Sequence, residues 1–378
     1  KKTGMVIVAT RPKSCTATLA VALDTAMPRI RADHMSLGSE APGTSMTFYI
    51  APGSSYQSDD ATTTAWQKVE RAREQGFDAL RRETASWWGA FYGTSSVSLP
   101  DPELAMWYAR SLYYHGVFFG NTHIPPGCNA ASTESFGGAV CPEYDLVFSQ
   151  QALLYTNHLN ESAGIVDWIA GVLPRAERYA KEGLTLHKTT ARYSGGAKYG
   201  ALMGFDGTIS VPPTEAEGVS ALSNYPGANA AAMALAHADW AVDGAGDETA
   251  KRILKATAHV SLEDQQWRED LGGILDRRMP NTVQQSAAVF LLRESLERGV
   301  VEPGWEEMAG KILLPTGDFN GVPVVVAGVG ATPFAGYGDA SWLIGLWWYG
   351  NDSTDDPRVR ATYDMICQSF TGKYVFNN

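Results

Sequence analysis

The sequence has little of several features that mark particular classes of protein. No run of apolar residues approaches the ~20 that a helix needs to span a bilayer. The 30 Lys and Arg residues are outnumbered by 41 Asp and Glu residues, which gives a net charge of -11. Because nucleic-acid binding depends on attraction to phosphate, such an acidic chain disfavours that partner. We therefore expect neither a membrane-spanning protein nor a nucleic-acid-binding protein.

Cysteine is also scarce, and the four cysteines show no C-x-x-C spacing; they are Cys15, Cys128, Cys141 and Cys367. The seven histidines have no metal-ligand spacing either, so we expect no metal ion and no cofactor. Cys128 and Cys141 bracket a loop and are compatible with a disulfide in an oxidising compartment or with two free thiols. The start at Lys1, without Met or an apolar signal region, favours a processed secreted or periplasmic protein and leaves a cytoplasmic one open.

Strand signals are sparse outside the first 60 residues. Short β-rich runs separated by Pro, Gly and Ser occupy this part, and they predict a β-rich segment over residues 1–60, the end of a β-sandwich. Beyond it the chain repeats helical segments of roughly 12 to 20 residues with Gly- or Pro-marked loops. The predicted helices are 102–119, 145–158, 162–182, 227–242, 246–258, 282–298, 339–349 and 357–370. Such hairpins bury one face of every helix when they close in a ring, so residues 61–378 predict a mainly α domain, an (α/α)6 toroid.

Aromatic residues, by contrast, are abundant. The chain has 11 Trp and 16 Tyr residues, and aromatics make up 11% of it. Flat rings stack on the apolar faces of sugars, although the same rings also fill large cores. Trp342, in the predicted helix 339–349, is a candidate sugar platform. The composition therefore favours a carbohydrate partner.

Two long loops carry chemically useful residues. The loop 120–142 contains His123, and the loop 184–228 contains Lys198 together with the pair Glu215 and Glu217. Loops of this length inside a compact domain are usually functional or disordered. Their Phe, Tyr, Cys and Pro content argues against disorder, so we expect them to form a site.

Two acidic pairs fit the chemistry of glycoside cleavage. An inverting glycosidase needs one carboxyl that protonates the leaving oxygen and a second group, about 6.5 to 9.5 Å away, that activates water. Glu143 and Asp145 open a predicted helix, and Glu215 and Glu217 precede another. Their alternative roles are a helix cap for the first pair and solvated loop positions for the second.

Further residues are secondary candidates. Asp276 and Asp339 are alternative bases, although Asp339 precedes a predicted helix and also fits an N-cap. Lys198 and Arg277 are candidates for binding hydroxyls or a substrate carboxylate, and surface salt bridges are the alternative role of both. His123 is a candidate for substrate binding.

The order and spacing of several segments resemble the six-hairpin glycosidase superfamily, and in particular glycoside hydrolase families 65 and 95. The similar segments are 82–88, 97–103, 138–148, 173–180 and 195–199. The resemblance places Glu215 at the position of the general acid, with Glu217 as its competitor. Where family 95 has two asparagines spaced i, i+2 that orient water, this sequence has Glu143 and Asp145. The resemblance implies an exo-acting, inverting hydrolase.

Three alternatives remain beside the hydrolase. A phosphorylase of the same architecture would use phosphate in place of water, but the phosphate-binding Ser-His stretch of that family corresponds here to 282–286, which lacks the histidine. A carbohydrate-binding protein without catalysis is the second alternative, because the acid pattern departs from the family. A polysaccharide lyase is the third alternative, because some lyases also have helical toroids. The sequence indicates neither the sugar and linkage nor the oligomeric state.

Overall fold

The structure is a computed structural model of the 378-residue chain. It describes residues 4–10, 16–24, 47–55, 58–120, 125–126, 139–183, 192–209, 223–333, 343, 345–351 and 355–373. The chain divides into two compact units, Lys1–Gly93 and Thr94–Asn378. Each unit is described by itself.

The first unit is a small antiparallel sheet covered by a helix. The strands β1 (Gly4–Thr10), β2 (Thr16–Asp24) and β3 (Thr47–Ser54) lie in the order β1-β2-β3. Alternate residues of β3 are buried, as expected for a strand with one covered face. Helix α1 (Ala61–Gln75) packs on β2 and β3, and α2 (Phe77–Gly93) follows it.

Helix α1 belongs to the first unit, together with the strands. Ala65 and Val69 of α1 are fully buried in one cluster with Ala20, Ala22 and Tyr49 of the sheet. Gly53 lies so close to α1 that an added Cβ would meet the carbonyl oxygen of Ala61. Because α1 packs on the strands, the contacts divide the chain between Gly93 and Thr94, and not at the predicted boundary between residues 60 and 61.

The second unit is mainly helical. Its longer helices are α3 (Pro102–Phe119), α4 (Tyr144–Tyr155), α5 (Leu159–Glu182), α7 (Tyr225–Trp240), α8 (Asp247–Glu263), α9 (Thr282–Glu297) and α12 (Pro357–Lys373). The short elements are η2 (Val242–Gly244), β4 (Gln265–Arg268), β5 (Gly273–Asp276), α10 (Trp305–Met308), β6 (Thr316–Phe319) and β7 (Val322–Val325). The strands form two separate antiparallel hairpins, β4-β5 and β6-β7. No helix within the described residues is long and apolar enough to cross a membrane.

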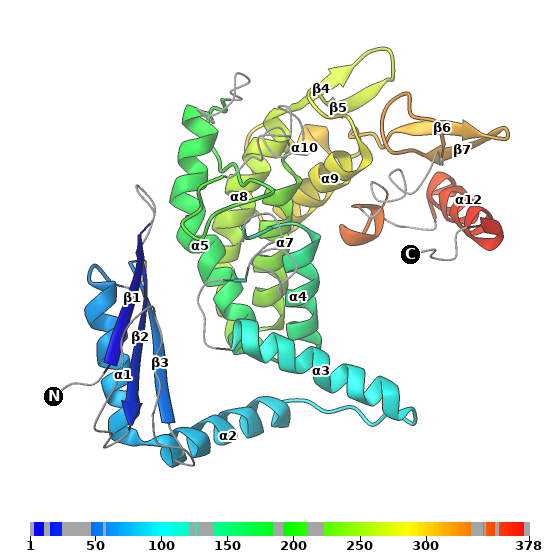
Figure 1. Ribbon diagram of the computed structural model, residues 1–378. Helices are drawn as coiled ribbons and strands as arrows, with labels where there is room; N and C mark the ends of the chain where they lie inside the picture. The colour runs from blue at the N-terminus through cyan, green and yellow to red at the C-terminus, as the bar shows by residue number, and fades with distance from the viewer. Residues whose placement is uncertain are drawn as a thin grey trace. The chain divides into compact units, whose positions relative to one another are not determined.

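Helix α7 is the centre of the second unit. It packs against α4, α5, α8 and α9, and Figure 1 shows these helices side by side around it. Its sequence contains seven alanines, most of them buried, because small side chains let several helices approach it at once. By contrast, α5 and α8 are amphipathic, with buried faces such as Ile165, Ile169 and Leu173 in α5. This arrangement of inner and outer helices is that of an α/α toroid.

Candidate functional site

The N-terminal ends of α4, α7 and α9 meet at one end of the second unit. The phenol of Tyr225, the first residue of α7, donates a hydrogen bond to Oε1 of Glu143 at 2.5 Å, and Glu143 is the residue before α4. In the first turn of α9, Oε1 of Gln284 accepts the backbone N–H groups of Asn224 (3.0 Å) and Tyr225 (2.9 Å). Three helix N-termini, whose dipoles favour negative charge, therefore lie together.

The two acids that precede and open α4 have different surroundings. Glu143 occupies the N-cap position of α4, yet its side chain makes no capping hydrogen bond and instead accepts the phenol of Tyr225. Its carboxylate is half-buried and joins α4 to α7. Asp145 is exposed in the first turn of α4, where a carboxylate also offsets the helix dipole. The geometry therefore argues against a simple cap for Glu143 and leaves that role compatible with Asp145.

The described residues on either side of the segment 210–222 are linked to the stretch 140–143. On one side, Met203 pairs with Val140 and with Ile209, the last described residue before that segment. On the other side, Ser223 leads directly into Asn224 and Tyr225, and Tyr225 contacts Glu143. The amide of Asn229, one turn into α7, donates to the carbonyl of Pro142 at 3.3 Å. Ile209 is thus linked to Val140 through Met203, and the start of α7 contacts Pro142 and Glu143.

Lys198 fixes the returning end of this segment. Its ammonium group is buried, with 3% of the residue exposed, and it donates to the backbone carbonyl of Ser223 and to Oδ1 of Asn224 (2.6 Å). The backbone N–H of Lys198 is held in turn by the carbonyl of Ala176 in α5 (2.9 Å). Burial lowers the pKa of Lys198 to about 7, although the negative charge of Asp264 opposes this shift.

Asp264, directly after α8, is the centre of a buried polar network. The residue has no exposed surface. Its Oδ1 accepts Nε of Arg277 (3.0 Å) and Nε of Arg278 (2.7 Å), while its Oδ2 accepts the phenol of Tyr193 (2.7 Å) and the amide of Asn224 (2.8 Å). Burial, reinforced by the charge of Asp264, raises the pKa of Tyr193, so this phenol stays a donor. The network joins α7, α8 and the turn after β5.

Asp276 shapes that turn. Its Oδ1 accepts the backbone N–H groups of Arg278 (2.8 Å) and Met279 (2.7 Å), and its own N–H donates to Oε1 of Gln285 in α9 (2.7 Å). Burial raises the pKa of Asp276, and these two N–H donors act in the opposite direction. Asp276 thereby holds Arg277 and Arg278 in place for their contacts with Asp264.

The described residues include five of the ten candidates from the sequence. Glu143 and Asp145 flank the start of α4, whereas Lys198, Asp276 and Arg277 belong to the region around Asp264. The guanidinium of Arg277 is paired with Asp264, and 41% of its side chain is exposed. The other candidates, Glu215, Glu217, His123, Asp339 and Trp342, lie outside the described residues.

Sequence reasoning missed Asp264 and Arg278. A signal for Asp264 exists, because an acidic residue at the C-terminal end of a helix is opposed by the helix dipole and therefore needs cations nearby. Those cations are Arg277 and Arg278, which follow Asp264 by 13 and 14 residues, after the β4-β5 hairpin. Tyr193 and Asn224, the other partners, lie 71 and 40 residues away in the sequence.

The chemical groups at this end of the helices suit a polar, uncharged ligand. The carboxylates of Glu143 and Asp145 can accept hydrogen bonds from hydroxyl groups and activate water, and the partly exposed Arg277 can donate, whereas the buried Lys198 donates to Ser223 and Asn224. Among the described residues, no group of three or more His, Cys, Asp and Glu side chains is arranged to hold a metal ion. Cys141, two residues before Glu143, takes part in a disulfide bond, whereas Cys128, its predicted partner, lies outside the described residues.

The fold is similar to that of a solved structure described as "Putative kojibiose phosphorylase from human microbiome". The two align with a TM-score of 0.62 at 11% sequence identity, over 83% of this chain and 46% of the other. The chain therefore spans about half the length of that protein. No protein-family model and no curated protein matches the sequence. The likeness shows the fold and confirms the predicted mainly helical toroid.

Proposed function

We propose that the chain is a glycoside-active enzyme that hydrolyses a glycosidic bond with inversion, by general acid and base catalysis between paired carboxyl groups. Glu215 is the proposed general acid, with Glu217 as the alternative. Glu143 and Asp145 are the proposed groups that activate water. The substrate is an oligosaccharide or another glycoside, attacked from its end.

One observation carries this proposal: both described ends of the segment that bears Glu215 and Glu217 are linked to the stretch around Glu143, Ile209 through Met203 and Val140, and Ser223 through Tyr225. Glu215 lies six residues after Ile209, and Glu217 lies six residues before Ser223. At ~3.5 Å per residue, each acid is within about 20 Å of an anchored end. A separation of ~6.5 to 9.5 Å between the two pairs, as inversion requires, is therefore within the reach of the chain.

The proposed reaction is a single displacement at the anomeric carbon. The carboxyl of Glu215 gives its proton to the glycosidic oxygen as the bond from that oxygen to the anomeric carbon breaks. On the opposite face of the sugar, Glu143 or Asp145 accepts a proton from water, and the water oxygen forms the new bond. One proton is given and one is taken, so the pair returns to its starting state when a proton is exchanged with solvent.

The network around Asp264 has a positioning role in this proposal. Lys198 binds the carbonyl of Ser223 and the side chain of Asn224, at the described end of the acid-bearing segment. Gln284 accepts the backbone N–H groups of Asn224 and Tyr225. Catalysis needs reacting groups placed to within a fraction of an ångström. A buried set of charged hydrogen bonds supplies that rigidity.

The similar solved structure supports a sugar substrate and also points to the main competitor, since its description names a phosphorylase. In a phosphorylase, phosphate takes the place of water and no base is needed. The side chains of Glu143 and Asp145 would repel phosphate at this position, which favours water. The disulfide of Cys141 supports a secreted or periplasmic location, because structural disulfides persist in oxidising compartments.

A panel of disaccharides and oligosaccharides, incubated with and without inorganic phosphate, tests the proposal. We expect free sugar to be released without phosphate, with inverted anomeric configuration in the first NMR spectra. Glu215→Gln should abolish release while the thermal midpoint stays unchanged, and Glu269→Gln, at an exposed position, is the matched control.

Each other outcome has a definite meaning. Full activity of Glu215→Gln moves the acid to Glu217, which Glu217→Gln then tests. Release only with phosphate identifies a phosphorylase. Binding of glycans without any product identifies a carbohydrate-binding protein, and unsaturated products that absorb ultraviolet light identify a lyase. Activity that survives Glu143→Gln combined with Asp145→Asn removes the proposed base.

A further inference from the structure

A serine, a histidine and two glutamates form a second polar cluster, on the side of α8 that faces the segment 192–200. Ser194 belongs to that segment, His259 and Glu263 lie one turn apart in α8, and Glu302 precedes α10. No metal-ligand spacing or motif marks these residues in the sequence. None of them takes part in the contacts of Asp264 or Glu143.

The distances within the cluster are those of a relay from a nucleophile to a base and then to an orienting acid. The hydroxyl of Ser194 is 2.8 Å from Nε2 of His259, and Nδ1 of the same ring is 2.7 Å from Oε2 of Glu302. A carboxylate on Nδ1 fixes the orientation of the ring. The side chain of His259 is 20% exposed, so the ring is held in place yet remains accessible.

Two glycines follow the serine and leave backbone donors available. Within the described residues, neither the N–H of Gly195 nor that of Gly196 is donated to a protein acceptor. Gly196 has φ +77°, and an added Cβ would lie 2.5 Å from the carbonyl oxygen of Ala256. A Cβ at Gly195 would lie 3.3 Å from Nε2 of His259. At Gly196 only glycine lets the backbone pass this close to α8, whereas a side chain at Gly195 would crowd the imidazole of His259.

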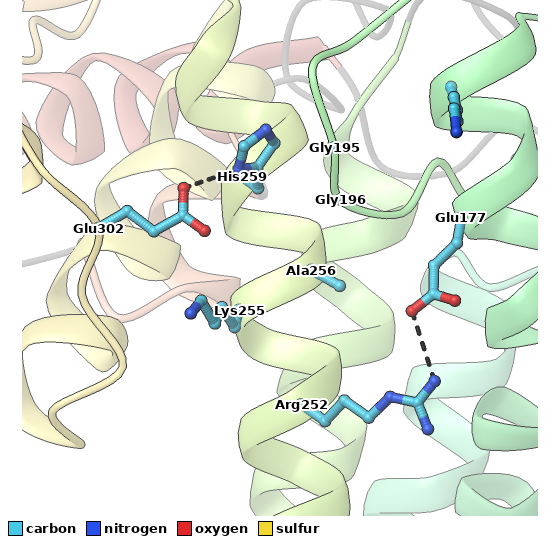
Figure 2. Close-up of a pocket in the computed structure, with 9 residues that line it drawn as sticks. Glu177, Gly195, Gly196, Arg252, Lys255, Ala256, His259 and Glu302 are labelled. Carbon is cyan, nitrogen blue, oxygen red and sulfur yellow. Dashed lines mark hydrogen bonds and ion pairs between the residues drawn. The ribbon is translucent and has the colours of Figure 1, made fainter.

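A cavity of about 410 Å³ opens beside these groups. Figure 2 shows His259, its bond to Glu302, and Gly195 and Gly196 on its wall. Ala256 and the two glycines line it beside His259, whose Nε2 is 2.8 Å from the hydroxyl of Ser194, which is not itself part of the lining. The remaining wall is charged and consists of Glu177, Lys181, Arg252, Lys255 and Glu302.

We propose that Ser194, His259 and Glu302 form a catalytic triad that hydrolyses short-chain carboxylic esters of polar alcohols, such as O-acetylated sugars. The small residues Gly195, Gly196 and Ala256, on the wall beside His259, fit a short acyl group. The charged wall fits a leaving alcohol rich in hydroxyl groups, because each charged side chain offers hydrogen bonds to such groups. A pocket of this size accommodates a small ligand of that kind.

The chemistry closes in two steps. Oγ of Ser194 attacks the ester carbonyl as its proton passes to Nε2 of His259, and His259 then gives that proton to the departing alcohol, leaving an acyl-serine. Water attacks the acyl-serine in the same way and releases the carboxylic acid and the free serine. The N–H groups of Gly195 and Gly196 are the proposed donors to the oxyanion in both steps.

Glu263 sets the resting position of the serine. Its Oε2 is 2.8 Å from the hydroxyl of Ser194, and its carboxylate accepts the backbone N–H of the same residue at 2.9 Å. The serine proton therefore has two acceptors, Glu263 and His259. Only the conformer that points to His259 is reactive, so we expect Glu263→Gln to change the rate but not to abolish it.

A fluorophosphonate probe tests the triad on the wild-type chain without relying on any variant. We expect a covalent adduct at Ser194, located by peptide mass spectrometry, and loss of labelling in Ser194→Ala and in His259→Ala. Ser98→Ala, at an exposed position, is the matched control and should be labelled like wild type. Hydrolysis of 4-nitrophenyl acetate and of an O-acetylated sugar should fall at least ~100-fold in Ser194→Ala.

An orienting role for Glu302 has its own readout. Glu302→Gln should lower the hydrolysis rate by about 10- to 100-fold while the fluorophosphonate still reacts slowly at Ser194. Absence of an adduct on folded wild-type protein overturns the proposal, as does ester hydrolysis by Ser194→Ala at the wild-type rate. The glycoside assay described above is independent of both results.

Discussion

The buried carboxylate of Asp264 offers the sharpest test of the structure. Replacing it by asparagine keeps the volume and removes the charge, so no cavity forms. Nε of Arg277 and Nε of Arg278, at 3.0 and 2.7 Å, then lose their counter-charge. An amide oriented to accept these donors also turns its own NH₂ toward the amide of Asn224, which donates to Oδ2 at 2.8 Å. One buried donor therefore faces another.

The magnitude follows from burial. Asp264 has no exposed surface, and 19% of the side chain of Arg278 is exposed, so water replaces little of the lost interaction. Removing one partner of such a buried pair costs about 3–5 kcal/mol. We expect Asp264→Asn to lie near the lower limit, with a fall of about 3 kcal/mol in the free energy of unfolding. Urea denaturation followed by far-ultraviolet circular dichroism measures it.

Asp270→Asn is the matched control for this prediction. Asp270 pairs with Arg268 at 2.8 Å, but 61% of its side chain is exposed, so water replaces the lost contact. The urea midpoint of Asp270→Asn should equal that of wild type. A loss below about 1 kcal/mol in Asp264→Asn would contradict the reasoning, because a buried charge with four donors cannot be neutralised at so small a cost.

Three further predictions concern Lys198, Gly196 and Tyr225. The pKa of Lys198 is lowered from its ordinary value to about 7, so between about pH 7 and pH 10 the unfolded chain binds a proton that the folded chain has lost. The urea midpoint of wild type should therefore rise relative to that of Lys198→Met over this range. A constant difference between the two midpoints would contradict the lowered pKa. Gly196→Ala should destabilise the fold by about 2 kcal/mol more than Gly299→Ala, because both glycines have positive φ but only a Cβ at position 196 would meet a backbone oxygen. Equal losses of stability in thermal denaturation would contradict the close approach of Gly196 to α8. Tyr225→Phe removes the hydrogen-bond donor to Glu143. Because a hydrogen bond to a charged group is worth ~1.5–3 kcal/mol, kcat on any cleaved glycoside should fall about 10-fold or more. An unchanged kcat would show that Glu143 takes no part in the reaction.

Helix positions followed closely from periodicity in the sequence. The predicted helix 102–119 coincides with α3, and 282–298 differs from α9 by one residue. The end of α8 was placed too early, at 258 instead of Glu263, because no Gly or Pro marks it. The four-residue strands β4, β5 and β6 were missed, since strands of that length are too short to show a period of two.

The division into units did not follow from the same patterns. Helix α1 has the amphipathic spacing of the later helices, and periodicity does not say whether a buried face packs on helices or on a sheet. The buried faces of Ala65 and Val69 pack on strands, so α1 belongs to the first unit. That information lies in contacts of α1 with both β2 and β3, the former including Ala20 and Ala22, which are more than 40 positions before Ala65.

The candidate acids were named from sequence patterns and stay predictions, whereas no such pattern named the residues that support them. Carboxylates before predicted helices mark Glu143 and Asp145, and the resemblance marks Glu215. The support for this region depends on Asp264, Arg278 and Tyr193, whose partners meet only in the folded chain. No local pattern records such a network.

The most direct test of the central claim is a distance in an experimental structure with a bound monosaccharide. The proposal predicts that the carboxyl carbon of Glu215 lies about 6.5 to 9.5 Å from that of Glu143 or Asp145, with the sugar between them. Carboxyl groups that face solvent on opposite sides of the helices would contradict the proposal and leave only the fold.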